Sequence, residues 1–233
     1  MFRPHHRFAN CVKLEASFQR LQTEGFISPE IVLGFNRYHF ALIHKLKSAR
    51  YHVDALTETL SSTSPVDSLS GSSDFMFKVN MHLDGFFYSG GSALDILARE
   101  LLTYFGVSLP NNVYYSTAHS KLTASHASDP ILDRIKDPLW KRDFSTFRNA
   151  LTHELLVAGQ YNINVRLDGA SEVTTLVLPL PDDPRVDPSS RTTRKYPDAD
   201  EYCRSHIRRL LSLINTIYGD VAARMVSQNA LPL

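Results

Sequence analysis

Apolar residues recur every three or four positions through most of the chain, a spacing that predicts helices. The longest seam follows Ser28-Pro29-Glu30, which supplies a helix N-cap, a proline at the first helical position and an acid in the first turn. Its positions alternate steps of four and three without a break and are Phe35, His39, Leu42, Leu46, Ala49, Val53, Leu56 and Leu60. A heptad seam of this length predicts a long helix that packs nearly antiparallel or parallel to a long neighbour.

Further helices are predicted for about 75–105 and about 197–227, with a short amphipathic one at 11–22. The serine-rich residues 61–73 are expected to form a flexible connection. Gly90-Gly91 lies in the middle of the second long helix, where each glycine costs about 1 kcal/mol relative to alanine. We interpret the pair as the site of a close helix crossing, and the approach of a ligand to the backbone is the alternative.

One region departs from the helical spacing. Apolar and polar residues alternate before the turn signal Asp168-Gly169, and a β-rich return follows it. This pattern predicts a β-hairpin at about 161–180, inserted before the last helix, and a proline-rich loop at 179–197. The predicted fold class is mainly all-α, a helical bundle with long antiparallel helices and this one hairpin. We expect residues 1–27 to form an N-terminal helical extension and residues 28–233 the main helical domain.

Charge and cysteine content narrow the classes of function. A formal net charge of +1 gives no overall attraction to nucleic acid, so any RNA binding must use a local patch. Cys11 and Cys203 fit no metal-binding spacing and are interpreted as reduced thiols. No apolar run is long enough for a membrane span, and the first residues lack the apolar region of a signal peptide. We therefore expect a cytoplasmic protein without a membrane segment, a cofactor or a metal site.

The candidate chemistry is concentrated between Trp140 and His153, where an aromatic-rich helix is predicted at about 138–158. It contains Arg148-Asn149-x-x-x-His153. Arginine offers a fixed cation for a phosphate group, and histidine can move a proton near neutral pH. Together these two side chains suffice for cleavage of RNA without a metal.

Helical geometry separates the motif from the apolar side of its helix. The predicted core stripe consists of Trp140, Phe144, Phe147, Leu151, Leu155 and Ala158. Asn149 and His153 share the opposite face with Leu156, which suggests contact with a second copy of the helix. Arg148 and His153 differ by roughly 140° around an ideal helix. Either the helix is irregular there, or the site combines side chains from two subunits across a two-fold axis.

These residues resemble the signature of the HEPN superfamily (higher eukaryotes and prokaryotes nucleotide-binding), in which an arginine and a polar residue precede a histidine by three to five further residues. Arg148, Asn149 and His153 match all three positions. The aromatic residues before them, and the run from Leu94 to Glu100 in the preceding long helix, are also similar to such proteins. In helix order the resemblance extends over roughly residues 28–225.

The resemblance implies a metal-independent endoribonuclease that acts as a homodimer in a toxin–antitoxin or antiviral defence system. Arg148, Asn149 and His153 would be its catalytic residues, RNA its substrate, and an antitoxin or regulatory protein a further partner. Other members keep the fold without the chemistry, so the alternative is a non-catalytic module that binds a nucleotide, an RNA or a protein. HEPN toxins silenced by nucleotidylation carry a tyrosine two residues after the histidine. Leu155 stands there, so that control is not expected.

Several other residues are weaker candidates. Asp95 and Glu100 could support catalysis, with surface or helix-pair roles as the alternative. The RNA-binding candidates, which could equally form solvated helix faces, are Lys141, Arg142, Arg204 and Arg208, together with Arg134, Lys136 and Arg209. His39 is interpreted as a hydrogen-bonded core or rim histidine rather than a device that fixes helix register. A zinc-protease motif is excluded because Val157 stands where its second histidine would be.

Overall fold

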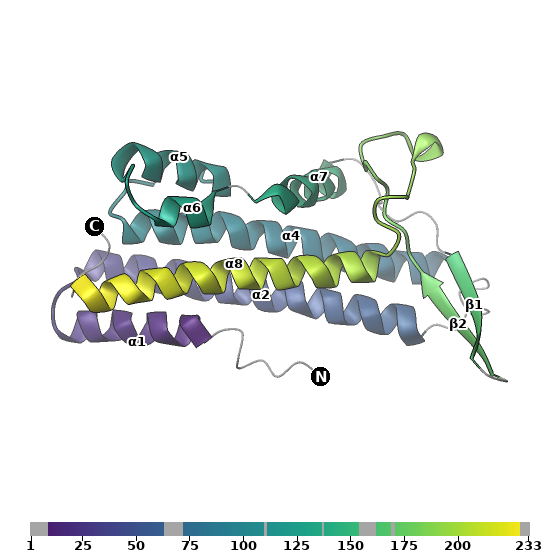
Figure 1. Cartoon of the computed structure of the whole chain (residues 1–233), viewed down its shortest axis with the longest axis horizontal. Helices are drawn as coiled ribbons and strands as arrows, with labels where there is room; N and C mark the ends of the chain where they lie inside the picture. Colours follow the sequence, from purple (N-terminus) through teal and green to yellow (C-terminus); the bar gives the residue numbers. More distant parts are fainter. Residues whose placement is uncertain are drawn as a thin grey trace. The chain divides into compact units, whose positions relative to one another are not determined.

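The protein, seen in a computed structural model, is described for residues 9–62, 72–109, 111–136, 138–153, 162–168 and 171–228. Within these ranges it is mainly helical with one two-stranded antiparallel hairpin, which confirms the predicted fold class (Figure 1). The helices are α1 (Ala9–Thr23), α2 (Pro29–Ser62), α4 (Ser72–Tyr104), α5 (Tyr115–Ser125), α6 (Ile131–Ile135), α7 (Leu139–His153) and α8 (Ala199–Gln228), with a 3-10 turn at Pro188–Ser190. None of the described helices combines the length and apolarity that a membrane crossing requires.

The chain divides into two compact units, the first built from three separate segments and the second from two. Unit 1 comprises Met1–Leu46, Ser92–Leu139 and Arg208–Leu233, and unit 2 comprises Lys47–Gly91 and Trp140–Ile207 with the helices they contain. The long helices α2, α4 and α8 contribute residues to both units. The predicted division into residues 1–27 and 28–233 stays a prediction.

Unit 1 packs α1, α5 and α6 with parts of the three long helices. Its apolar interior includes a stacked pair, Phe18 and Phe35, whose ring centroids are 3.9 Å apart. The α1 helix is fixed to α8 at one end by Asn10, whose Nδ2 donates to the carbonyl of Asn215 at 2.8 Å. At its other end the Arg20 guanidinium donates to the carbonyl of Met225 at 3.2 Å. These two bonds fix the position of α1 along α8.

Unit 2 has an aromatic interior to which α7 is attached. Phe144 and Phe147 are buried there, as the predicted core stripe requires, and Leu151 is half-buried. Both rings contact Phe87 of α4, with centroid distances of 5.1 and 5.4 Å. We call the interlocking rings of this unit the aromatic cluster, which consists of Phe86, Phe87, Phe144, Phe147, Tyr196 and Tyr202. Offset and edge-to-face contacts of this kind add to the stabilisation from apolar burial.

The glycine pair of α4 marks the crossing of α4 with α7. A Cβ atom on Gly90 would lie 2.7 Å from the Phe144 ring, and one on Gly91 would lie 2.5 Å from the Arg148 side chain. Any larger residue would therefore collide with α7. The predicted close helix crossing at Gly90-Gly91 is confirmed.

The hairpin consists of β1 (Asn162–Asp168) and β2 (Ser171–Val177), paired from Asn162 with Val177 to Asp168 with Ser171. This agrees with the predicted hairpin at about 161–180. The proline-rich segment after it folds back on itself, because Leu180 pairs with Tyr196 across it and the Leu180 side chain is buried. The predicted extension of the motif helix to about 158 lies outside the described residues, as does most of the expected connection at 61–73.

Candidate functional site

Arg148, the cation of the predicted site, lies against the backbone of α4 within unit 2. A Cβ atom on Gly91 would be 2.5 Å from its Cδ and 2.7 Å from its Nε. The arginine side chain therefore crosses α4 where only glycine leaves room for it. Arg148 as a whole is half-buried, so the packed stem restricts where the guanidinium can reach.

The other two motif residues lie on the same helix. Asn149 is exposed, as predicted from its place opposite the core stripe. His153 is the last residue of α7, and its side chain lies outside the described part of the structure. Whether His153 faces Arg148 of its own subunit or of a second copy thus stays a prediction.

A polar anchor fixes α7 beside the motif. Asp143 accepts hydrogen bonds from the Tyr196 hydroxyl at 2.7 Å and from Lys195 Nζ at 3.0 Å. Partial burial raises the pKa of the Asp143 carboxyl, but these two bonds outweigh it and hold the pKa below its usual value. The anchor joins α7 to the segment that precedes α8. It restrains α7 at the residue before Phe144, which is buried in the interior with Phe147.

The basic candidates differ in how their side chains are engaged. Arg142 is exposed on α7, and Lys141 beside it is half-buried. Arg204 is already held within unit 2, because its Nε donates to Asp200 at 2.8 Å and its Nη2 to Thr57 at 2.7 Å. Arg208 is exposed on α8 and belongs to unit 1. Of the four, Arg142 is best placed as a cation next to the motif.

Asp95 and Glu100, the weaker carboxylate candidates, both have structural partners in unit 1. Asp95 accepts a hydrogen bond from the backbone N–H of Tyr115 at 3.1 Å, which satisfies a free amide at the start of α5. Glu100 is fully buried between helices. Both side chains thus join neighbouring helices, which is the alternative role that the sequence analysis gave them.

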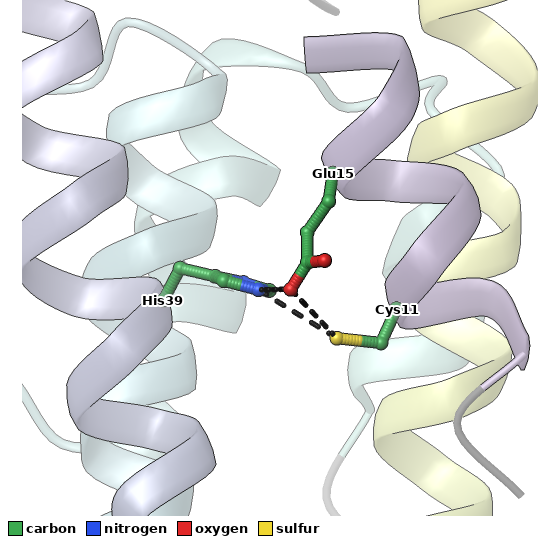
Figure 2. A group of neighbouring side chains, drawn as sticks. All are labelled: Cys11, Glu15 and His39. Atoms are coloured by element: carbon green, nitrogen blue, oxygen red, sulfur yellow. Dashed lines mark hydrogen bonds and ion pairs between the residues drawn. The ribbon is translucent and has the colours of Figure 1, made fainter. Parts of the chain in front are cut away.

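Sequence reasoning did not predict a second group of reactive side chains, which surrounds His39 in unit 1. His39 Nε2 lies 2.9 Å from Glu15 Oε1 and 3.6 Å from Cys11 Sγ, and the thiol donates to Glu15 at 3.5 Å (Figure 2). On the other side of the ring, His39 Nδ1 lies 2.9 Å from Glu100 Oε1. Glu100 also accepts hydrogen bonds from two buried tyrosine hydroxyls. We call the whole group the polar cluster, which consists of Cys11, Glu15, His39, Glu100, Tyr104 and Tyr218.

The close packing of the polar cluster shifts the pKa values of His39, Tyr104 and Tyr218. Burial lowers the pKa of His39, but its contacts with Cys11, Glu100 and Glu15 outweigh that effect and raise the pKa to about 10. Burial, together with the nearby Glu100 carboxylate, raises the pKa of Tyr104 and of Tyr218 well above the usual value. The raised pKa favours the protonated form of His39, which lies between the side chains of Glu15 and Glu100, and both tyrosines keep their hydroxyl protons as donors. The interpretation of His39 as a hydrogen-bonded core histidine is confirmed.

The signal for this cluster was present in the sequence only in part. Cys11 and Glu15 are four residues apart on α1 and so share one face of it. His39 occupied an apolar seam position of α2, which marks a buried polar group. Nothing in the spacing joins these two observations, because only the packing of α1 against α2 brings the side chains together.

Comparison with known proteins adds no relative: no protein-family model, no curated protein and no solved structure matches the chain. The resemblance to HEPN proteins thus depends on Arg148, Asn149 and His153 and on their place in a helical fold.

Proposed function

We propose that the protein is a metal-independent endoribonuclease of the HEPN type, with Arg148 and His153 as its essential residues. The observation that carries the proposal is the packing of the Arg148 stem across Gly91, which a side chain at that position would prevent. A surface arginine with no further role does not need a glycine beneath it. An arginine that must meet a phosphate at a fixed place does, because a restrained cation loses less conformational entropy on binding.

The chemistry assigned to the three residues is a transesterification within the RNA. The 2′-hydroxyl attacks the adjacent phosphorus, and the bond from phosphorus to the 5′-oxygen breaks. The products carry a 2′,3′-cyclic phosphate and a 5′-hydroxyl. In the proposed mechanism His153 transfers a proton in this step, a contribution typically worth about 10²–10⁴ in rate. Arg148 stabilises the charge that develops on the phosphoryl oxygens, and Asn149 orients His153 or the phosphate.

The working form that we propose is a homodimer with two composite sites. The basis is helical geometry, since Arg148 and His153 differ by roughly 140° around a regular helix, which would not bring them together in one copy unless the helix is irregular there. In a two-fold dimer the arginine of one copy can meet the histidine of the other. Lys141, Arg142, Arg204 and Arg208 are the cations through which the RNA backbone would be held. We place the activity in growth arrest or antiviral defence, under an antitoxin or regulatory partner.

The test is cleavage of total RNA in EDTA by the wild type, Arg148→Ala, His153→Ala and a matched control, Arg142→Ala. The control removes an exposed arginine from the same helix six residues earlier. We expect cleavage by the wild type, a loss of at least about 100-fold in Arg148→Ala and in His153→Ala, and a much smaller loss in Arg142→Ala. Circular dichroism establishes that each variant is folded.

Mixing the two inactive variants tests the composite site. A heterodimer of Arg148→Ala with His153→Ala contains one site with both residues and one with neither, so activity should return on mixing. If each copy holds its own pair, no mixture regains activity. Two outcomes would instead favour the non-catalytic binding module. One is equal cleavage by the wild type and Arg148→Ala, and the other is no cleavage by any folded sample with any activating ligand.

A further inference from the structure

We propose that Cys11, Glu15 and His39 form a binding site for a zinc ion, which joins α1 to α2 within unit 1. The three side chains offer a thiolate sulfur, an imidazole nitrogen and a carboxylate oxygen. Their ligand atoms lie within 4.8 Å of one another, and no other group of three such residues meets this condition in the part of the chain that the structure describes. The proposal is independent of the RNA-cleaving function, whose proposed catalytic residues belong to unit 2.

The spacing of the three donor atoms fits a tetrahedral metal. Zinc binds sulfur at about 2.3 Å and nitrogen or oxygen at about 2.0–2.2 Å, so neighbouring ligand atoms in a tetrahedral site are separated by roughly 3.3–3.6 Å. The separations are 3.6 Å between Cys11 Sγ and His39 Nε2, 3.5 Å between Cys11 Sγ and Glu15 Oε1, and 2.9 Å between His39 Nε2 and Glu15 Oε1. Only the flexible Glu15 carboxylate must move, by a few tenths of an ångström.

The second ring nitrogen of His39, which would not bind the metal, contacts a carboxylate, as the second nitrogen of metal-bound histidines commonly does. Its Nδ1 lies 2.9 Å from Glu100 Oε1, and Glu100 is fully buried. Such a carboxylate fixes the tautomer and raises the basicity of the metal-binding nitrogen. Glu100 is fixed in turn by the hydroxyls of Tyr104 at 2.5 Å and Tyr218 at 2.7 Å. The ring is therefore oriented with Nε2 toward Cys11 and Glu15 (Figure 2).

The scaffold holds the ligands in place and leaves one entry. Cys11 and Glu15 lie one helical turn apart on α1, and the His39 ring stacks on Phe35 with centroids 4.6 Å apart. Cys11 and His39 are buried, whereas the Glu15 side chain is 45% exposed. An ion can thus enter beside Glu15, and water can occupy the fourth position on that exposed side. Ligands on packed helices with one open position are typical of zinc sites with three protein ligands.

The chemistry of the donor atoms indicates which metal the site would hold. The donor set favours zinc over magnesium or calcium, because thiolate and imidazole are poor ligands for those harder ions. A metal-free ion triad of Glu15, His39 and Glu100 is the competing account.

The experiment is titration of the purified, untagged full-length protein with Co²⁺ as a spectroscopic substitute, followed by displacement with Zn²⁺. A cobalt ion bound by Cys11 produces a thiolate-to-metal charge-transfer band and the intense visible bands of tetrahedral cobalt. The thiolate band separates this site from histidines elsewhere in the chain. We expect one equivalent to bind, the band to vanish in Cys11→Ser, and the band to persist in the matched control Cys203→Ser, whose cysteine is buried in unit 2.

Two further variants keep the test decisive. Glu15→Gln changes a half-exposed side chain, so folding should persist, and we expect zinc affinity to fall at least tenfold. Glu100→Gln should weaken zinc binding by about 10- to 100-fold through the orientation of His39. No thiolate band in the wild type, or equal zinc affinity in the wild type, Cys11→Ser and Glu15→Gln, would overturn the proposal and leave the ion triad as the account of this cluster.

Discussion

The interiors of the two units are both largely apolar but differ in how much charge they bury. Unit 1 buries charge: His39 and Glu100 have no exposed surface, and their partners come from α1, α4 and α8. Unit 2 buries rings, and the interior under α7 is the aromatic cluster. A buried ion pair seldom adds stability beyond what apolar residues of the same volume would give. The polar cluster contains the group for which we propose a zinc ion, whereas the aromatic cluster supports α7.

The largest loss of stability is expected when a buried side chain is removed from either cluster, although the physical cause differs between the two units. Glu100→Ala removes the fully buried acidic partner of His39, so the free energy of unfolding should fall by about 3–5 kcal/mol. Phe147→Ala should cost a similar amount, about 3–5 kcal/mol, through the cavity it leaves. Urea unfolding in EDTA measures both.

The conservative variants tell the two causes apart. Glu100→Gln keeps the shape but not the charge and should still destabilise the protein strongly, because His39 then keeps only the half-exposed Glu15 as an acidic partner. Phe147→Leu keeps an apolar side chain and should lose much less than Phe147→Ala. If Glu100→Gln were as stable as the wild type, the polar cluster would not depend on charge and the contrast between the units would fail.

The sequence predicted the helices and strands better than it predicted the tertiary contacts between them. The heptad seam of α2 and the alternation before Asp168-Gly169 are local patterns, and both elements formed where they were expected. The same holds for Phe144 and Phe147, whose burial follows from helical spacing. The glycine pair also carried its own signal, since glycines in mid-helix are costly unless a neighbour needs the space.

The polar cluster lay beyond the reach of local patterns. Its members Cys11, His39, Glu100 and Tyr218 are separated by tens of residues, so no periodicity connects them. Their meeting depends on how α1, α2, α4 and α8 pack, which is a property of the folded chain. For the same reason the sequence placed Glu100 among the candidates for catalysis, while the structure shows it bonded to His39.

A smaller effect is expected from the ion pair between Asp129 and Arg224 in unit 1, whose two side chains are only partly buried. Both oxygens of Asp129 accept from the Arg224 guanidinium. Partial burial raises the pKa of Asp129, but the bonds from Arg224 and from the backbone N–H of Ile131 outweigh it and lower the pKa. Asp129→Asn should therefore lower the unfolding free energy by about 1.5–3 kcal/mol at neutral pH.

The pH dependence of that loss follows from the direction of the shift. A carboxyl whose pKa is lower in the folded state stabilises the protein above its unfolded pKa of about 3.9, and this contribution disappears as pH falls through the folded pKa. The difference between the wild type and Asp129→Asn should be constant from about pH 5 upward and shrink below about pH 4. A difference that stays constant down to acid pH would show that the ion pair is not its source.

The two glycines of α4 should respond differently to alanine. Gly90→Ala forces a methyl group against the buried Phe144 ring, so we expect a loss of about 1–3 kcal/mol. Gly91→Ala meets only the Arg148 side chain, which can move away, and alanine favours the helix, so stability should change by less than about 1 kcal/mol.

For the rate of RNA cleavage, Gly91→Ala should have a larger effect than Gly90→Ala, the reverse of their order in stability. Gly91→Ala displaces Arg148 and should reduce the rate toward that of Arg148→Ala, although the protein remains stable. Thermal unfolding and cleavage measured on the same samples test this pair. Full cleavage by Gly91→Ala would mean that the packing of Arg148 on α4 has no part in function.

The most direct test of the proposed function is the chemistry of the cut. Wild-type protein is incubated in EDTA with an RNA whose cleavage site has been mapped, and with the same RNA carrying a single 2′-deoxy nucleotide at that site. We predict that the first is cut to a 2′,3′-cyclic phosphate and a 5′-hydroxyl, and that the second is not cut at the modified position. Cleavage at the 2′-deoxy position, or cleavage of either RNA by His153→Ala at the wild-type rate, would contradict the assignment of Arg148 and His153 as the cutting pair.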